Sequence, residues 1–117
     1  MDISNIEHDL ISEIKLSEIQ AKVFLFLVTK GKSSAEKIGH TLDISSEESR
    51  KIAKQLVELG SLIEITENVF ESMHPRFTAV NMYRKMCERE KIDFKRNVIV
   101  DNIGVALERS YEDARTK

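Results

Sequence analysis

The chain has 117 residues, of which 41% are hydrophobic, so it has room for one domain with a modest core. A formal net charge of -2 argues against a protein that holds DNA by electrostatic attraction alone, and the single cysteine, Cys87, excludes a disulfide framework within the chain. Because no apolar run approaches the ~20 residues that span a bilayer and no secretory signal is visible, we expect a cytoplasmic protein that does not contact membranes.

The chain opens with an amphipathic pattern. Apolar residues recur at helical spacing over residues 3–14, and the other positions are rich in Asp and Glu. This pattern predicts an N-terminal helix with an acidic outer face. A basic stretch over residues 76–96 balances that acidic beginning and could face either the acidic helix or phosphate.

Three serines are each followed three residues later by a Gln or Glu. This is the spacing of a capping box, in which the serine oxygen and the acidic or amide side chain satisfy each other's backbone amides at a helix start. The three pairs are Ser17 and Gln20, Ser33 and Glu36, and Ser45 and Glu48. Apolar periodicity then predicts helices over 18–30, 34–41 and 46–59, with Asp43-Ile44 as a turn. Gly31 and Gly60 mark the ends of the first and third helices.

The periodicity changes after residue 60. Residues 62–65 read as a strand and residues 66–68 as a turn, and we expect residues 77–80 to form the returning strand with Pro75 at its beginning. Asn81 would then cap a helix that begins at Met82. From there to about residue 114 the pattern fits either one long helix or two helices with a break near residues 92–93.

The predicted elements give a mainly α (α+β) fold. Their order is that of a winged helix-turn-helix with an N-terminal helix and a long C-terminal dimerisation helix. We expect residues 1–15 to form the N-terminal amphipathic helix, 16–80 the winged domain, and 81–117 the helical dimerisation region.

The stretch from Leu16 to Ile65 resembles the archaeal TrmB-like regulators, within the wider MarR-like winged-helix group. The resemblance rests on Leu16-Ser17 through Ala21, on Ser34-Ala35 through Ile38, and on Leu56 through Gly60. The later RFTAVN at residues 76–81 is similar to the second wing strand of that family. The pattern is more specific for the fold than for a DNA site or an effector.

The resemblance implies a homodimeric, sequence-specific regulator of transcription that binds double-stranded DNA. Two recognition helices would enter successive major grooves about 34–36 Å apart. The residues expected at the DNA are Ser33, Ser34, Ser45, Ser46, Glu47, Arg50, Lys51, Lys54, His74 and Arg76, the last two on the wing.

The start of the expected recognition helix departs from the family, where arginines or neutral polar residues are usual. Glu48 is better explained as the capping partner of Ser45 than as a base reader, and Glu47 can favour the positive end of the helix dipole. Two adjacent carboxylates would repel phosphate, although one glutamate can accept from cytosine N4. Ser49 stands where relatives commonly carry an apolar residue, so we expect a looser seating of this helix.

The dimer interface is expected where apolar residues repeat with roughly heptad spacing near the C-terminus. Gly104 interrupts that run, and a close approach of another helix would justify its cost of roughly 1 kcal/mol. The expected interface residues are Ile6, Leu10, Ile99, Ile103, Ala106, Leu107 and Tyr111.

The sequence contains no pattern typical of an enzyme. It has no phosphate-binding glycine loop and no nucleophile elbow, and its histidines and cysteine lack the spacing of a zinc site. We therefore expect no catalytic residues, no cofactor, no metal and no small-molecule effector. The near-neutral recognition helix leaves a second hypothesis open, a winged-helix protein–protein interaction module of the transcription or another nucleic-acid machinery.

Overall fold

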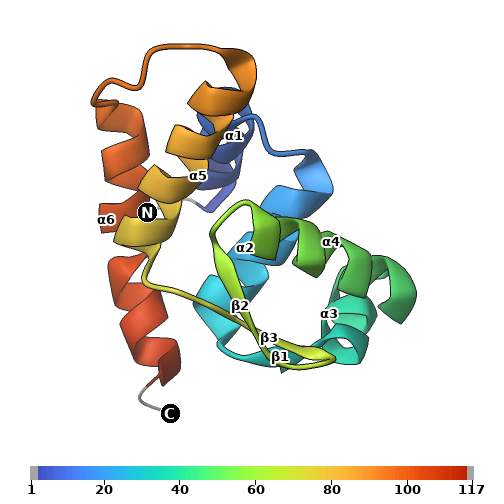
Figure 1. Ribbon diagram of the computed structural model, residues 1–117. Helices are drawn as coiled ribbons and strands as arrows, with labels where there is room; N and C mark the ends of the chain where they lie inside the picture. The colour runs from blue at the N-terminus through green and yellow to red at the C-terminus, as the bar shows by residue number, and fades with distance from the viewer. Residues whose placement is uncertain (1–2, 116–117) are drawn as a thin grey trace.

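The computed structural model describes residues 3–115, and of residues 3 and 4 only the backbone. Within that range the fold is a mainly helical α+β arrangement of six helices and a three-stranded antiparallel sheet, compatible with a winged helix-turn-helix (Figure 1). The ends of the predicted flanking regions, residues 1–2 and 116–117, lie outside it. The elements are α1 (Ile3–Ile14), α2 (Glu18–Lys30), β1 (Ser33–Ser34), α3 (Ala35–Leu42), α4 (Ser46–Glu58), β2 (Leu62–Thr66), β3 (Val69–Ser72), α5 (Pro75–Glu90) and α6 (Val98–Arg115).

Serine side chains cap three of the helices. At α2 the capping box is complete: the Gln20 amide donates to Ser17 Oγ over 3.2 Å, and the Ser17 amide donates to Gln20 Oε1 over 2.9 Å. At α4 only half of the predicted box forms within residues 3–115: Ser45 Oγ accepts from the Glu48 amide, but the Glu48 side chain does not accept from the Ser45 amide. The predicted box at Ser33 is wrong by one residue, because Ser34 caps α3 while Ser33 pairs with Phe70 in the sheet.

The predicted second strand is also wrong. The strand that returns after the turn at residues 67–68 is β3, which lies between β1 and β2 in the sheet. Residues 77–80 are helical and belong to α5. Pro75 occupies the first turn of that helix, where its fixed φ fits and its missing amide is not needed, and Asn81 lies in the helix interior. The apolar residues 77–80 therefore follow helical periodicity, with Phe77 left 71% exposed.

The C-terminal region forms two helices. Lys91 adopts a left-handed conformation at φ 57° and ends α5, and Asn97 Oδ1 accepts from the amides of Ile99 and Val100 at the start of α6. The two helices lie side by side in Figure 1. They touch at Gly104, where an added Cβ would lie 2.7 Å from the Cα of Arg76. This is the close approach of another helix that would justify a glycine inside α6.

The core surrounds α2, which contacts α1, α4 and α6, as expected for a helix that is apolar on all sides. Most of the stripe predicted to hold a dimer is instead part of this core. Four of the seven residues are at most 5% exposed, two are partly buried against the core, and Ile99 is 42% exposed. The four are Ile6, Leu10, Ile103 and Leu107, and the two are Ala106 and Tyr111.

The reason for this difference is that the chain reverses direction between α5 and α6, so α6 packs along both α1 and α2 of its own chain. Periodicity shows that a helix has an apolar face, but it does not show which helix covers it. Among residues 3–115, no helix combines the length and hydropathy needed to cross a membrane.

Candidate functional site

A tight corner joins α3 to α4. Asp43 ends α3 in the left-handed conformation, and the Ile44 amide donates to the Gly39 carbonyl over 2.9 Å. A Cβ at Gly39 would lie 2.6 Å from the Ile44 carbonyl oxygen and 2.9 Å from Ser49 Oγ. Ser49 is fully buried there and donates to the Ser45 carbonyl. The expectation of a loosely seated helix does not hold, because the small serine is what lets α4 approach α3.

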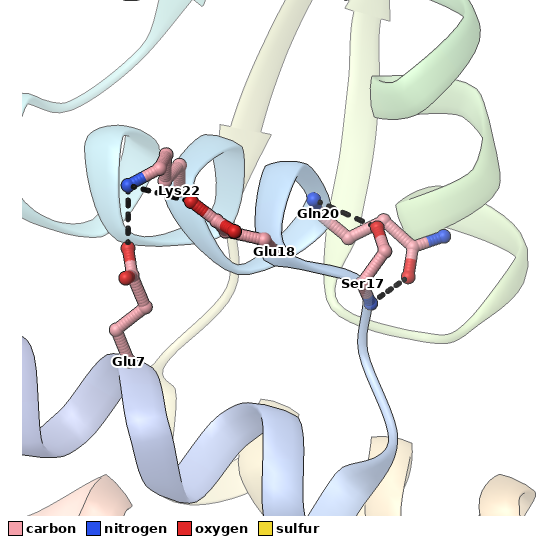
Figure 2. A network of polar contacts seen from close by, with 5 residues as sticks. All are labelled: Glu7, Ser17, Glu18, Gln20 and Lys22. Carbon is pink, nitrogen blue, oxygen red and sulfur yellow. Dashed lines mark hydrogen bonds and ion pairs between the residues drawn. The ribbon is translucent and has the colours of Figure 1, made fainter.

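The capping amide of α2 provides a second support for α4. Gln20 Nε2 donates to Gln55 Oε1 over 3.0 Å, so the capping box that starts α2 also contacts the side of α4. Figure 2 shows the box beside an ion pair in which Lys22 lies 3.3 Å from Glu7 on α1 and 3.6 Å from Glu18. The hydrogen bond to Glu7 and the two negative charges raise the pKa of Lys22. These contacts join α1, α2 and α4.

The outer face of α4 is open and polar. It carries a shallow hollow of about 660 Å³, and no other helix or strand contributes to its lining. Its charges balance, with three acidic and three basic side chains. The lining residues are Ser45, Glu47, Glu48, Arg50, Lys51, Lys54, Gln55 and Glu58.

The β2–β3 hairpin lies beside this face and neutralises two of its cations. Lys54 Nζ is 3.3 Å from Glu64 Oε1. Arg50 Nη2 is 3.7 Å from Glu67 Oε1, and Arg50 Nε donates to the Glu67 carbonyl. Lys51 is exposed and has no ion pair within residues 3–115. The hairpin therefore determines which α4 cations are available to a partner.

The structure brings six of the ten residues predicted at the DNA onto one surface, at the first turns and outer face of α4: Ser45, Ser46, Glu47, Arg50, Lys51 and Lys54. Ser34, the cap of α3, lies on the neighbouring helix. Ser33 is only 4% exposed and donates to the Gly31 carbonyl, so its side chain is not available to phosphate.

His74 and Arg76 lie outside the hairpin, at the start of α5. His74 caps α5, and its ring meets that of Tyr111 edge-on with 5.1 Å between centroids. Arg76 Nε is 3.5 Å from Glu108 Oε2 on α6. Their expected position on a wing is wrong, because it depended on a second strand at 77–80 and that segment is helical.

Sequence reasoning missed Glu64 and Glu67, the two hairpin carboxylates that pair with α4. A signal was available: residues 62–72 contain three glutamates and neither Lys nor Arg, next to a helix that carries three cations. The side-by-side placement of β2 and α4 makes these charges partners.

Comparison with known proteins gives no relative. No protein-family model matches the sequence, and no curated protein or solved structure is significantly similar to the chain.

Proposed function

We propose that this chain is a winged helix-turn-helix protein that binds double-stranded DNA as a homodimer and regulates transcription. The observation that carries the proposal is the α3–α4 corner with the polar outer face of α4 left uncovered. A second helix seated tightly on a first, and open on its other side, has the shape that enters a major groove. The β2–β3 hairpin would be the wing.

In this proposal each part of the α4 surface has a different task. Ser45 and Ser46 at the helix start would approach the DNA backbone, since amides and hydroxyls at a helix N-terminus suit phosphate. Lys51, which has no carboxylate partner among the described residues, would supply a charged contact. Glu47 is exposed in the first turn and could accept from cytosine N4 in the groove.

The charge of the surface predicts weak non-specific binding. The α4 cations are matched by an equal number of carboxylates, and the hairpin adds three glutamates. Because non-specific affinity comes from cations that displace counterions at phosphate, few such contacts are available. The preference for one sequence would then come from base contacts and from the two-fold arrangement of a dimer.

The direct test is fluorescence anisotropy with labelled genomic DNA fragments at low and moderate salt. We expect saturable binding that weakens with salt. Lys51→Ala should weaken binding to all fragments about equally and reduce the salt slope by about one counterion. Lys95→Ala, an exposed lysine in the loop before α6, is the matched control and should bind as the wild type does. Wild-type protein that shows no salt-dependent binding to any fragment would refute the proposal.

The homodimer would use the solvent-facing side of α6 rather than the stripe first expected. Val98 and Val105 are 62% and 52% exposed and, being seven residues apart, share one face of the helix. Phe77 at the start of α5 is also exposed. Val105→Asp should leave the fold intact and convert a dimer to a monomer in light scattering. A wild type that is monomeric at micromolar concentration would contradict this part.

A second function is favoured by the hairpin itself. β2 is an edge strand of the sheet, and Ile63 and Ile65 on it are 40% and 43% exposed between the acidic side chains. Exposed apolar residues on an edge strand suit a protein partner better than phosphate. If DNA binding fails, a pull-down that compares the wild type with Ile65→Asp tests whether the winged helix is a protein-interaction module.

A further inference from the structure

Three side chains with metal-binding chemistry converge where α5 begins beside α6. His74 precedes α5, and Glu108 and Glu112 are one turn apart on α6. Each offers a ligand atom, and these atoms all lie within 4.8 Å of one another. His74 and Glu108 are partly buried, whereas Glu112 is exposed and has no hydrogen bond or ion pair within residues 3–115.

We propose that His74, Glu108 and Glu112 bind a divalent transition-metal ion such as Zn²⁺. One imidazole and two carboxylates make a donor set that suits first-row transition metals, because an imidazole ligand disfavours Mg²⁺ and Ca²⁺. Three protein ligands leave a fourth tetrahedral position for water. With ligand bonds of about 2.0–2.1 Å, tetrahedral donors lie about 3.4 Å apart, so the carboxylates must move inward by roughly an ångström. The free Glu112 side chain can make that movement.

Arg76 contacts two of the three candidate ligands. Its guanidinium lies 3.5 Å from Glu108 and offsets part of the negative charge of the two carboxylates. Its backbone amide donates to His74 Nδ1 over 3.2 Å. A neutral imidazole that accepts at Nδ1 carries its proton on Nε2. Metal binding therefore breaks this capping hydrogen bond by either route. An ion at Nδ1 takes the lone pair that accepts from Arg76, and an ion at Nε2 moves the proton to Nδ1, which then cannot accept. The ion also competes with Arg76 for Glu108.

The bound ion would join the segment between β3 and α5 to α6. His74 comes two residues after the end of β3, and both glutamates belong to α6. The Tyr111 ring, edge-on to the imidazole, and Arg115, which lies 4.6 Å from the Tyr111 ring centroid, already hold this corner. A metal bridge would fix the exit of the β2–β3 hairpin relative to α6. The inference does not depend on DNA binding.

The experiment is titration of the purified full chain with Zn²⁺ by calorimetry and with Co²⁺ by visible absorption, with Mg²⁺ as the comparison ion. We expect one Zn²⁺ per chain, a Co²⁺ absorption band, and no binding of Mg²⁺. Because a ligand that binds only the folded state stabilises it, Zn²⁺ about a hundredfold above its Kd should raise Tm by roughly 10 °C.

Glu112→Gln is the cleanest variant, because this side chain is exposed and makes no hydrogen bond or ion pair within the described residues. It and His74→Gln should each weaken Zn²⁺ binding at least roughly tenfold, since even loss of an outer hydrogen-bond partner costs a metal site about 10–100-fold. Glu88→Gln and His40→Gln replace exposed residues of the same types elsewhere and should bind as the wild type does. Circular dichroism of each apo variant checks that it is folded.

Arg76→Gln should change Zn²⁺ affinity in the opposite direction, and it tests whether Arg76 and Zn²⁺ compete for Glu108. Without the guanidinium, Glu108 is free and the site is more negative, so Zn²⁺ affinity should increase severalfold. The proposal is overturned if the wild type shows no saturable Zn²⁺ or Co²⁺ binding at micromolar concentrations. It is equally overturned if Glu112→Gln binds as tightly as Glu88→Gln, which would indicate adventitious binding at other side chains.

Discussion

Glu64→Gln should increase DNA affinity by releasing Lys54. In the structure Lys54 Nζ lies 3.3 Å from Glu64 Oε1, with side-chain exposures of 43% and 34%. An ion pair this exposed stabilises the folded protein by about 0.2–1 kcal/mol. A phosphate that takes Lys54 must break this pair, so removing the carboxylate should raise affinity by a factor of roughly 1.4 to 5 at about 1.36 kcal/mol per tenfold.

The salt dependence of binding provides a second measurable quantity, the slope of log K against log salt. If Lys54 stays paired with Glu64 in the wild-type complex and contacts phosphate only in the variant, the slope of log K against log salt should steepen by about 0.9. Between about 50 and 200 mM salt this adds a further loss of roughly 3.5-fold relative to the wild type. Fluorescence anisotropy on one DNA fragment across a salt series measures both the affinity and the slope.

Two controls separate a released lysine from a general change in charge. Glu88→Gln removes one negative charge from an exposed position on α5 and should change neither quantity by a comparable amount. In a Lys54→Ala background, Glu64→Gln should have a much smaller effect, because no lysine remains to be released. If Glu64→Gln raises affinity equally in both backgrounds, the reasoning from the ion pair is refuted.

Three further predictions concern the fold. Ile103→Ala should lower the free energy of unfolding by about 2–5 kcal/mol in urea denaturation, since this side chain is 1% exposed; a loss below about 1 kcal/mol would contradict its place in the core. Gly104→Ala should also destabilise, because its Cβ would lie 2.7 Å from the α5 backbone and the overpacking cost of roughly 1–3 kcal/mol outweighs the roughly 1 kcal/mol that alanine gains over glycine in a helix; a stabilised variant would show that α5 moves easily. Glu7→Gln should lower the raised pKa of Lys22 in an NMR titration. The pKa of Lys22 is higher in the folded than in the unfolded chain, so its contact with Glu7 stabilises the fold fully below the unfolded pKa. That stabilisation is lost as pH rises through the folded pKa. The variant lacks the contact, so its stability should fall less at alkaline pH. An unchanged Lys22 titration would contradict the contact.

Local chemistry determined the helices of the first half of the chain. Ser17 and Gln20 satisfy each other's backbone amides within one turn, so their spacing alone predicts where α2 begins. Ser45 likewise marks the start of α4, where its side chain accepts from the Glu48 amide. Gly60 marks the end of α4, and its φ of 85° suits glycine. At α3 the spacing misplaced the cap by one residue, because β1 pairs Ser33 with Phe70, a contact distant in sequence.

Pro75 shows where local signals were ambiguous. Proline is compatible with both an edge-strand start and the first turn of a helix, and Phe77 and Val80 are apolar in either case. In the structure, β3 follows a two-residue turn and completes the hairpin. Residues 77–80 are therefore not needed as a strand and belong to α5.

Only the tertiary structure determined which segment covers each apolar face and which carboxylate pairs with each cation. The sequence determined that Ile103 and Leu107 belong to an apolar stripe, but the turn between α5 and α6 directs that stripe into the core of the same chain. The sequence likewise determined that α4 carries three cations, whereas the position of the hairpin paired Lys54 with Glu64 and Arg50 with Glu67. The physical reason is the same in both cases. Periodicity and capping depend on neighbours within a few residues, while burial and ion pairing depend on segments that only folding brings together.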